Sequence, residues 1–431
     1  MERYSEYKDS GVQWLGEIPG HWGHVALSKI SEIILGKMLQ GETKKGTDML
    51  FPYICAKDVH FDGIDVSDLK TMYFSQSEMD LYGVRKGDML IVEGGAGAGN
   101  CSILREEVKN TGIQNSIMIV RSNADALSNY ICYFMSSIVR KGYVDFITNV
   151  ATIPHFTKEK VSRTNIPLPP LSEQHSIVSY LDDKCGKIDK MLEGKQKQIE
   201  LLAEMKQRII ADAVTHGLNP DVKMKATNIP WLPEIPEHWE LCRLKSLFSQ
   251  RTESYNPNEQ LEVLSLLKDV GVIPYSEKGN VGNKAKEDFS SYRIARKGDV
   301  IMNSMNVIIG SVDITQYDGY ISPAYYALTA KHGVSTEYYN YIFHMKACQK
   351  HMRSLANGIL EIRLRISATS LFGMYYPVPP QEEQIAIVSF INEKVVKIDT
   401  LTSKLQQEIE SIKEYKQRLI SDVVTGQIKI C

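Results

Sequence analysis

The sequence "PLPPLSEQHSIVSYL" at Pro167–Leu181 returns in altered form as "PVPPQEEQIAIVSFI" at Pro377–Ile391. In each copy a run of prolines is followed at once by polar residues and then by apolar residues at helical spacing. A proline disfavours helical backbone in the residue before it, and acidic residues suit the positive N-terminal end of a helix. Each copy therefore predicts the start of a long helix, and we expect Ser172 to be the N-cap of the first.

Both predicted helices carry an apolar stripe whose members alternate in spacing between three and four residues. This heptad pattern is typical of a coiled coil. At 1.5 Å per residue, roughly forty-four residues would make a helix of about 65 Å. Each helix is expected to end near a glycine, Gly217 or Gly426. The stripe contains Ile188, Leu192, Ile199, Leu202 and Ile209 in the first copy and Ile398, Leu405, Ile409, Ile412 and Leu419 in the second.

The two helices are expected to pair antiparallel. Lys206 and Lys416 occupy equivalent positions in the stripe, so parallel pairing in register would bring two ammonium groups together. Parallel pairing would also force the second half of the chain to travel back along the whole helix through a short linker. Antiparallel pairing avoids both costs and relates the two halves by a pseudo-twofold axis.

Further repeats show that the whole chain is a tandem duplication. The helical parts match almost position for position, while the bodies between them differ apart from one R-K-G-D turn. The sequence therefore predicts an α+β protein in which one scaffold carries two different mixed α/β bodies. The repeated pairs are "WLGEIPGHW" from Trp14 and "WLPEIPEHW" from Trp231, "RKGDMLI" from Arg85 and "RKGDVIM" from Arg296, "KIDKML" from Lys187 and "KIDTLT" from Lys397, and "KQRIIADAVT" from Lys206 and "KQRLISDVVT" from Lys416.

Composition narrows the class of protein. The 431 residues are too many for one core and suggest two to four domains, and the formal charge of -2 gives no preference for an acidic or a basic partner. None of the seven cysteines forms a C-x-x-C pair, and no stretch of about eighteen apolar residues occurs. We expect a cytoplasmic protein without a membrane span.

Several segments resemble enzyme motifs but have a simpler interpretation. "MLIVEGGAGAGN" at Met89–Asn100 has the glycines of a cofactor loop, but the short "CSILREEV" after it does not predict the helix that such a loop needs. We therefore predict a turn between strands there. The sequence contains no N-P-P-Y motif of an amino-methyltransferase and no H-E-x-x-H metal motif. No catalytic residue and no metal site is predicted.

The ordered combination of these motifs resembles the specificity subunit of a type I restriction-modification system. The resemblance rests on the proline run followed by "LSEQ" or "QEEQ", the "KID" step, the "KQRII" helix end and the twice-used "IPxHW", and it extends from Trp14 to Gly426. It implies two target recognition domains, each reading one half of a split, asymmetric sequence in double-stranded DNA. It also implies that the paired helices space these domains and dock two modification (methyltransferase) subunits and restriction (nuclease) subunits.

The resemblance gives the chain a non-catalytic role. It implies that the chain binds no cofactor, and that S-adenosylmethionine, ATP and Mg²⁺ belong to the partner subunits. The expected parts are a repeat segment at 1–23, target recognition domain 1 at 24–171, the first repeat helix at 172–217, a linker and repeat segment at 218–239, target recognition domain 2 at 240–380, and the second repeat helix with the C-terminus at 381–431. The alternative is a stand-alone DNA methyltransferase or nuclease whose motifs have diverged.

Candidate DNA-binding residues lie in both bodies and are of types that contact phosphates or base edges. The loop from Lys278 to Lys286 gathers three lysines and two asparagines, and arginine forks suit guanine or phosphate. The segments before the two proline runs differ, as expected if the bodies read different half-sites. The candidates are Lys57, His60, His155, Lys158 and Lys160 in the first body and Lys268, Tyr275, Lys278, Asn280, Asn283, Lys284, Lys286, Arg363 and Arg365 in the second.

Overall fold

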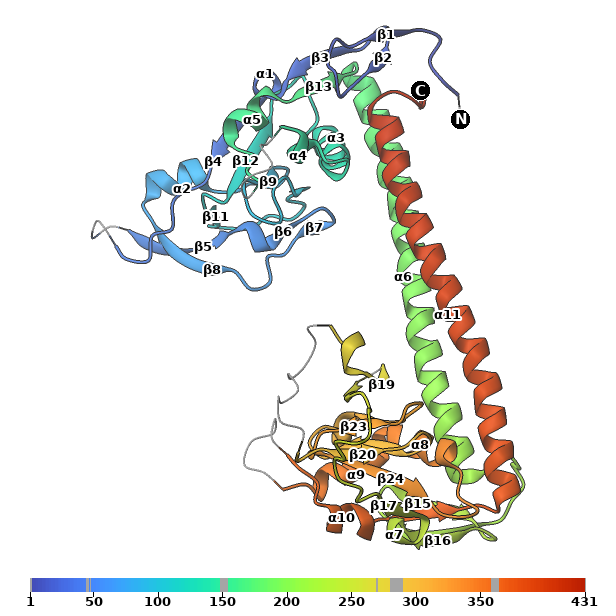
Figure 1. Cartoon of the computed structure of the whole chain (residues 1–431). Helices are drawn as coiled ribbons and strands as arrows, with labels where there is room; N and C mark the ends of the chain where they lie inside the picture. Colours follow the sequence, from blue (N-terminus) through green and yellow to red (C-terminus); the bar gives the residue numbers. More distant parts are fainter. Residues whose placement is uncertain are drawn as a thin grey trace. The chain divides into compact units, whose positions relative to one another are not determined.

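A computed structural model describes residues 2–43, 46, 48–147, 154–268, 270–279, 290–357 and 364–430. The chain divides into two compact units (Figure 1). The first combines Met1–Gln196 with Gln407–Cys431, and the second is Lys197–Gln406. Each unit therefore contains one body and a part of each of the two long helices.

The two proline runs lead directly into the two long helices, α6 (Leu171–His216) and α11 (Gln381–Val424). The backbone N–H groups of Glu173 and Gln174 both donate to the carbonyl of Pro170, at 2.9 and 3.0 Å. Helix α6 thus begins before Ser172, and the prediction that Ser172 is the N-cap is wrong. The predicted ends are confirmed, because Gly217 and Gly426 follow the helices with φ values of 78° and 73°, a left-handed conformation that favours glycine.

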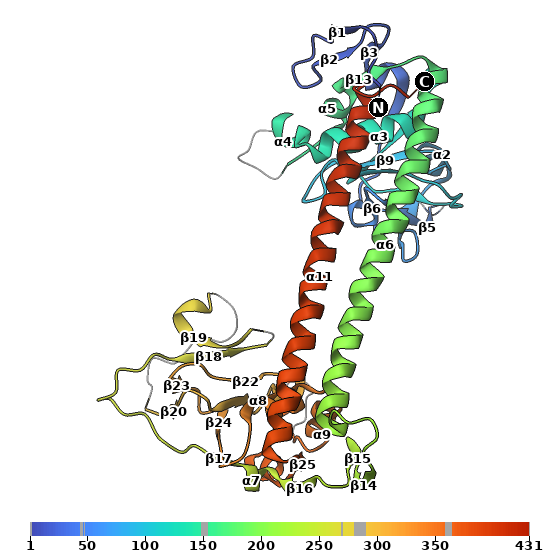
Figure 2. The same cartoon turned by 90° about the vertical axis from the view of Figure 1, so that its right-hand side faces the viewer.

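The helices pair antiparallel within each unit, as predicted (Figures 1 and 2). In the first unit the Lys416 ammonium lies 2.6 Å from the Asp189 carboxylate, and in the second unit the Lys206 ammonium lies 2.7 Å from that of Asp399. The apolar stripes of the two helices face each other and form a seam. The two lysines in this seam thus each bind the aspartate of a "KID" step on the opposite helix. The apolar residues predicted for the seam are buried or half-buried, and the residues between them are mostly exposed.

The body of the first unit is built around a four-stranded antiparallel sheet in the order β10-β9-β12-β4. All four residues of its strand β9 are buried, as expected for a continuous apolar run in a sheet covered on both faces. The sheet strands are β4 (Ser31–Leu35), β9 (Met89–Val92), β10 (Cys101–Ile103) and β12 (Ile117–Ser122), and the helices of this body are α1 (Leu27–Ile30), α2 (Gln76–Tyr82), α3 (Ser128–Arg140), α4 (Tyr143–Ile147) and α5 (Lys158–Arg163).

Smaller sheets complete the first unit. Strands β11, β5 and β8 form a three-stranded sheet in that order, and β13 pairs with β3 where the body joins helix α6. The strands are β1 (Tyr7–Asp9), β2 (Glu17–Pro19), β3 (Gly23–Ala26), β5 (Met49–Ile54), β6 (Val59–His60), β7 (Gly63–Ile64), β8 (Lys70–Phe74), β11 (Gly112–Ile113) and β13 (Asn165–Leu168), with a 3-10 turn η1 (Ala56–Asp58).

The body of the second unit repeats the central sheet in the order β17-β24-β21-β22. Strand β25 pairs with β16 as β13 pairs with β3. The strands are β14 (Met224–Ile229), β15 (Leu232–Pro236), β16 (Glu240–Arg243), β17 (Phe248–Gln250), β18 (Leu264–Leu267), β19 (Gly271–Pro274), β20 (Arg293–Ala295), β21 (Val300–Asn303), β22 (Val312–Ile314), β23 (Gly319–Ile321), β24 (Tyr325–Ala330) and β25 (Tyr375–Val378); the helices are α7 (Leu244–Leu247), α8 (Thr336–His344), α9 (Lys346–Ser354) and α10 (Ala368–Gly373), with 3-10 turns η2 (Tyr275–Glu277) and η3 (Val307–Ile309).

The glycine-rich segment after β9 is a turn between strands, as predicted. Strand β9 pairs antiparallel with β10, so residues 93–100 reverse the chain within one sheet and lead into no helix. Gly95 and Gly99 have φ values of 88° and 87°, which explains two of the glycines by backbone geometry alone. In the part of the chain that the structure describes, no helix is long and apolar enough to cross a membrane.

Candidate nucleic-acid interface

Each body is attached to the paired helices by the same set of contacts at the start of a helix. In the first unit, His21 Nε2 lies 2.9 Å from a carboxylate oxygen of Glu173, and the side-chain oxygen of Gln174 accepts the N–H of Leu127 at 2.9 Å. In the second unit, His238 Nε2 lies 2.6 Å from Glu383. Gln384 there accepts the N–H of Ser335, also at 2.9 Å. The "EQ" of each proline-run motif therefore connects a helix start to its body.

The same bodies hold the end of the opposite helix. The buried hydroxyl of Tyr130 donates to the carbonyl of Val424 at 3.1 Å, and that of Tyr338 donates to the carbonyl of Val214 at 2.7 Å. Burial raises the pKa of both phenols well above the usual value, so they remain neutral donors. These contacts of His21, Glu173, Gln174 and Tyr130, and their equivalents in the second unit, are called the hinge below. Each hinge fixes the first turn of one long helix and the last turn of the other.

The R-K-G-D turn of the first body holds a buried aspartate. Asp88 accepts two hydrogen bonds from Arg121 on strand β12, at 2.8 and 2.9 Å, and a third from the N–H of Arg85 at 2.7 Å. This two-point pairing neutralises a carboxylate that is almost completely buried. The turn is thereby fixed to the central sheet.

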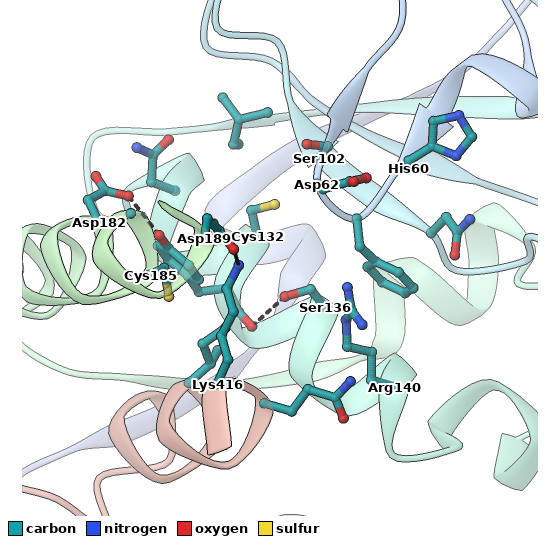
Figure 3. A pocket seen from close by; sticks show the side chains of 18 of the residues that line it. His60, Asp62, Ser102, Cys132, Ser136, Arg140, Asp182, Cys185, Asp189 and Lys416 are labelled. Atoms are coloured by element: carbon teal, nitrogen blue, oxygen red, sulfur yellow. Dashed lines mark hydrogen bonds and ion pairs between the residues drawn. The ribbon is translucent and has the colours of Figure 1, made fainter. Parts of the chain in front are cut away.

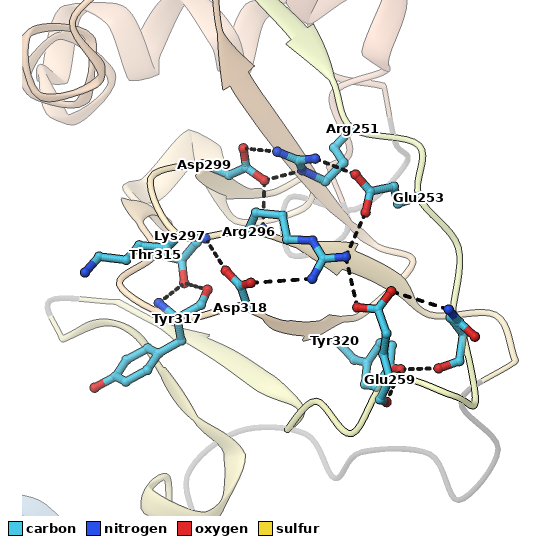
Figure 4. A network of polar contacts seen from close by, with 11 residues as sticks. Arg251, Glu253, Glu259, Arg296, Lys297, Asp299, Thr315, Tyr317, Asp318 and Tyr320 are labelled. Atoms are coloured by element: carbon cyan, nitrogen blue, oxygen red, sulfur yellow. Dashed lines mark hydrogen bonds and ion pairs between the residues drawn. The ribbon is translucent and has the colours of Figure 1, made fainter.

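In the second body, other residues donate hydrogen bonds to the side chain of the equivalent aspartate, Asp299 (Figure 4). Asp299 accepts from Arg251, which lies just after strand β17, at 2.6 and 3.0 Å, and from the Thr329 hydroxyl at 2.8 Å. Hydrogen bonds to Asp299 and to Glu253 raise the pKa of Arg251. The neighbouring Arg296 forms ion pairs with Glu253, Glu259 and Asp318 at 3.1, 2.9 and 3.4 Å.

A cleft of about 560 Å³ lies in the first unit between the body and the two helices (Figure 3). Its walls include His60 of the β6–β7 hairpin, Arg140 of α3 and the Asp189–Lys416 ion pair. The Arg140 guanidinium stacks 4.2 Å from the centre of the Phe61 ring. Of the predicted candidates in this body, only His60 lines the cleft.

The remaining candidates of the first body lie in two places. Lys57 is exposed on the turn before strand β6 and pairs with Asp58 at 3.3 Å. His155 is exposed just before α5, and Lys158 is exposed at the first position of that helix. The Lys160 ammonium donates to the carbonyl of His155 at 2.9 Å. The structure therefore places the Lys160 side chain against the backbone of His155, which it stabilises by this hydrogen bond.

In the second body the described candidates differ in accessibility. Lys268 and Arg365 are exposed, and Tyr275 is half-buried. Lys278 is only 8% exposed, and its ammonium lies 4.6 Å from the centre of the Tyr275 ring. Five further candidates lie outside the described residues, namely Asn280, Asn283, Lys284, Lys286 and Arg363.

Comparison with known proteins identifies the family. The sequence profile described as "Type I restriction modification DNA specificity domain" matches residues 19–201 and 236–411. The chain belongs to this family. Each matched segment contains one body and most of the long helix that follows it, so the two DNA specificity domains coincide with the two repeats.

Curated relatives agree with this assignment. The "Type I restriction enzyme MjaVIII specificity subunit" of Methanocaldococcus jannaschii is 23% identical over 442 residues, which cover 100% of this chain and 98% of that protein. The "Type I restriction enzyme EcoBI specificity subunit" of Escherichia coli is 22% identical over 308 residues, covering 67% of this chain and 64% of its own length. The resemblance inferred from the repeated motifs is confirmed.

Two solved structures share the fold. A chain from "Structural basis underlying complex assembly and conformational transition of the type I R-M system" superposes with a TM-score of 0.70 at 16% identity, covering 95% of this chain and 99% of that chain. The HsdS subunit from Thermoanaerobacter tengcongensis gives 0.53 at 16% identity, with 95% and 98% coverage. At this identity the likeness shows the fold alone, and it agrees with the predicted architecture.

Sequence reasoning missed several residues that shape the two DNA specificity domains. The repeated R-K-G-D turn indicated the buried aspartates, but nothing indicated their arginine partners, because Arg121 lies on strand β12 whereas Arg251 follows strand β17. It also missed Gly94, against which the ring of His155 lies: a Cβ added to Gly94 would be 2.6 Å from His155 Nδ1. Neither feature has a local signal in the sequence, because each depends on a contact between distant segments.

Proposed function

We propose that this chain is the DNA sequence-specificity subunit of a type I restriction-modification complex, and that its two bodies read the two halves of a split, asymmetric DNA target. The observation that carries the proposal is a duplicated scaffold with unlike bodies. The hinges and the two lysine–aspartate pairs recur residue for residue, whereas the exposed side chains of the bodies differ. Such a chain can carry two readers on one scaffold while letting each recognise different bases.

We further propose that the paired helices dock two methyltransferase subunits, and that restriction subunits join the same complex. Large apolar side chains that remain exposed are typical of interaction sites. The first unit carries Met191 and Tyr415, which are 52% and 51% exposed. The second carries Leu401 and Met205 at the equivalent positions, 47% and 54% exposed. Two matching apolar surfaces favour two copies of one partner.

Catalysis belongs to the partners in this proposal. S-adenosylmethionine, ATP and Mg²⁺ are bound by the methyltransferase and restriction subunits, and the chain itself carries no cofactor. The antiparallel turn at residues 93–100 supports this division, because a cofactor loop would open a helix. The complex would act on DNA in the cytoplasm.

The test uses the chain alone and together with its methyltransferase partner. We expect adenine methylation at a split DNA target only when both are present. Methylation or cleavage by the purified chain alone would instead support the alternative of a stand-alone methyltransferase or nuclease.

A matched pair of variants tests the docking surface. Met191→Glu with Tyr415→Glu should reduce the number of bound methyltransferase subunits from two to one, as measured by the mass of the complex. Leu201→Glu is the control, because Leu201 is also exposed, at 55%, but its equivalent in the other repeat is Ser411. Equal loss with the control would contradict this docking surface.

A further inference from the structure

The two bodies present one exposed side chain at the same place in the fold. In the first body the N–H of Phe156 donates to the carbonyl of Glu93 just after strand β9, at 2.7 Å. In the second body the N–H of Ile366 donates to the carbonyl of Ser304 just after β21, at 3.0 Å. The residues immediately before these buried anchors are His155 and Arg365, which are therefore structurally equivalent.

Both residues are held firmly by their backbone. His155 forms a β-bridge with Gly94, and its carbonyl accepts the Lys160 ammonium at 2.9 Å. Arg365 exchanges two backbone hydrogen bonds with Asn357, both of 3.0 Å. A short helix begins three residues after each, α5 in the first body and α10 in the second. The backbone that carries the side chain is therefore preorganised in both bodies.

The side chains at this place remain available to a ligand. His155 and Arg365 are both exposed. Within the described ranges, the ring nitrogens of His155 and the guanidinium of Arg365 form no hydrogen bond and no ion pair. Arginine donates to guanine through two N–H groups, and an imidazole can donate or accept at a single point. The position thus combines an equivalent backbone with different hydrogen-bonding chemistry, which is what two readers of different half-sites need.

We propose that His155 and Arg365 are specificity-determining residues, each of which contacts a base edge in the half-site read by its own body. The inference rests on the proposed function, because it needs the chain to read DNA. Gly94 is part of the same site in the first body. A side chain there would push the His155 ring away, since its Cβ would lie 2.6 and 2.8 Å from two ring atoms.

The experiment measures methylation by the complex of the chain with its methyltransferase partner, on a DNA library randomised across both half-sites. In His155→Arg we expect the preference for the parental base to fall by about tenfold at one position of one half-site, while the other half-site is unchanged. Arg365→His should alter one position of the other half-site. Gly94→Ala should weaken the preference at the same position as His155→Arg, although it changes no hydrogen-bonding group.

Arg163→His is the control for a general effect of an exposed arginine, because Arg163 lies on α5 of the first body and is 80% exposed as a side chain. It should leave both half-sites unchanged. His155→Asn and Arg365→Gln serve as second variants if a first one does not assemble. An equal loss on all sequences, or unchanged preferences in assembled variants, overturns the inference. A wild-type complex without any sequence preference would instead overturn the proposed function, and the inference with it.

Discussion

Each body pairs the buried aspartate of its R-K-G-D turn with an arginine, but the two arginines come from different parts of the sheet. Arg121 of β12 binds Asp88 in the first body, and Thr329 occupies its place on β24 in the second, because Val120 pairs with Met89 as Leu328 pairs with Val300. By the same register, Arg251 corresponds to Ile34 of β4. Both bodies therefore contain the same kind of ion pair. The arginine lies on the central strand β12 in the first body and after the neighbouring strand β17 in the second.

The helices behave differently from the bodies. Lys416 with Asp189 and Lys206 with Asp399 lie at equivalent sequence positions and have nearly equal distances. The scaffold therefore preserves its residues, whereas the bodies preserve only a physical requirement, that a buried carboxylate be paired. This difference separates the part of the molecule that must stay constant from the parts that can diverge with the DNA target.

The largest expected effect comes from lengthening the constant part. Inserting seven residues after Lys195 and seven after Leu405 should keep the seam in phase and lengthen the helix pair by roughly 10 Å. Since about 10 Å of B-DNA is close to three base pairs, the gap between the half-sites should grow by a few base pairs. Both half-sites should keep their sequences, as measured by sequencing methylated bases in cells.

Insertions of two or three residues are the control, because they rotate the seam out of register and should damage assembly. A parental gap in an active complex with the seven-residue insertions would contradict the spacing role of the helices.

The next effect tests whether the charge pair can be moved between strands. Arg251→Ile leaves Asp299 buried without its arginine and should lower the stability of the second unit by about 3–5 kcal/mol. Adding Thr329→Arg recreates the arrangement of the first body and should recover more than half of the loss. Both the loss and the recovery of stability can be measured by urea unfolding that is monitored through hydrogen exchange of the β21 amides. A double variant no more stable than Arg251→Ile would show that the two bodies are not interchangeable in this respect.

A smaller effect is expected at the seam. Lys206→Asp places two carboxylates together across the helices and should cost about 1 kcal/mol, because the pair is partly exposed. The double variant Lys206→Asp with Asp399→Lys should restore thermal stability, and the same exchange at Lys416 and Asp189 should behave alike in the first unit. Unequal behaviour of the two pairs would argue against the pseudo-twofold equivalence.

The smallest expected effect is the acid dependence of the second body. Hydrogen bonds from Arg251 lower the pKa of Glu253, and the N–H of Lys297 followed by Arg296 lowers that of Asp318. Because both pKa values are lower in the folded state, their contribution is present above the unfolded pKa and is lost as the pH falls through the folded one. We expect a loss below about 1 kcal/mol as the pH falls below about 5. Glu253→Gln should flatten this acid dependence in thermal unfolding; an unchanged slope would contradict it.

The scaffold could be predicted from sequence because its rules are local and periodic. The proline runs, the heptad stripe and the glycines at both helix ends each act within a few residues, and the seam lysines even indicated the antiparallel direction. The error at Ser172 has a local cause as well: the carbonyl of Pro170 accepts the first helical hydrogen bonds, so the helix starts before the serine can cap it.

The candidate interface was harder to predict, since exposed polar residues carry no periodic pattern. Residue type alone placed Lys278 with the accessible lysines, although its ammonium packs over Tyr275 and it is nearly buried. His155 and Arg365 each lie 12 residues before the first proline of their proline run, but the sequences around them differ. Only the hydrogen bonds to Glu93 and Ser304 show that their backbones occupy the same place in the fold. Contacts between distant segments decided these points.

The first unit is built from the two ends of the chain, which has a consequence for its synthesis on the ribosome. Its core joins Leu15, Ile18 and Trp22 to Leu419, Val423 and Val424, whereas the second unit is the continuous stretch Lys197–Gln406. Domains fold as their residues emerge, N-terminal parts usually first. Here the order is reversed: the second unit can be completed while the first still waits for its closing helix turn. The body translated first is therefore finished last, because its apolar residues Leu15, Ile18 and Trp22 lack their partners until the end of α11 has been made.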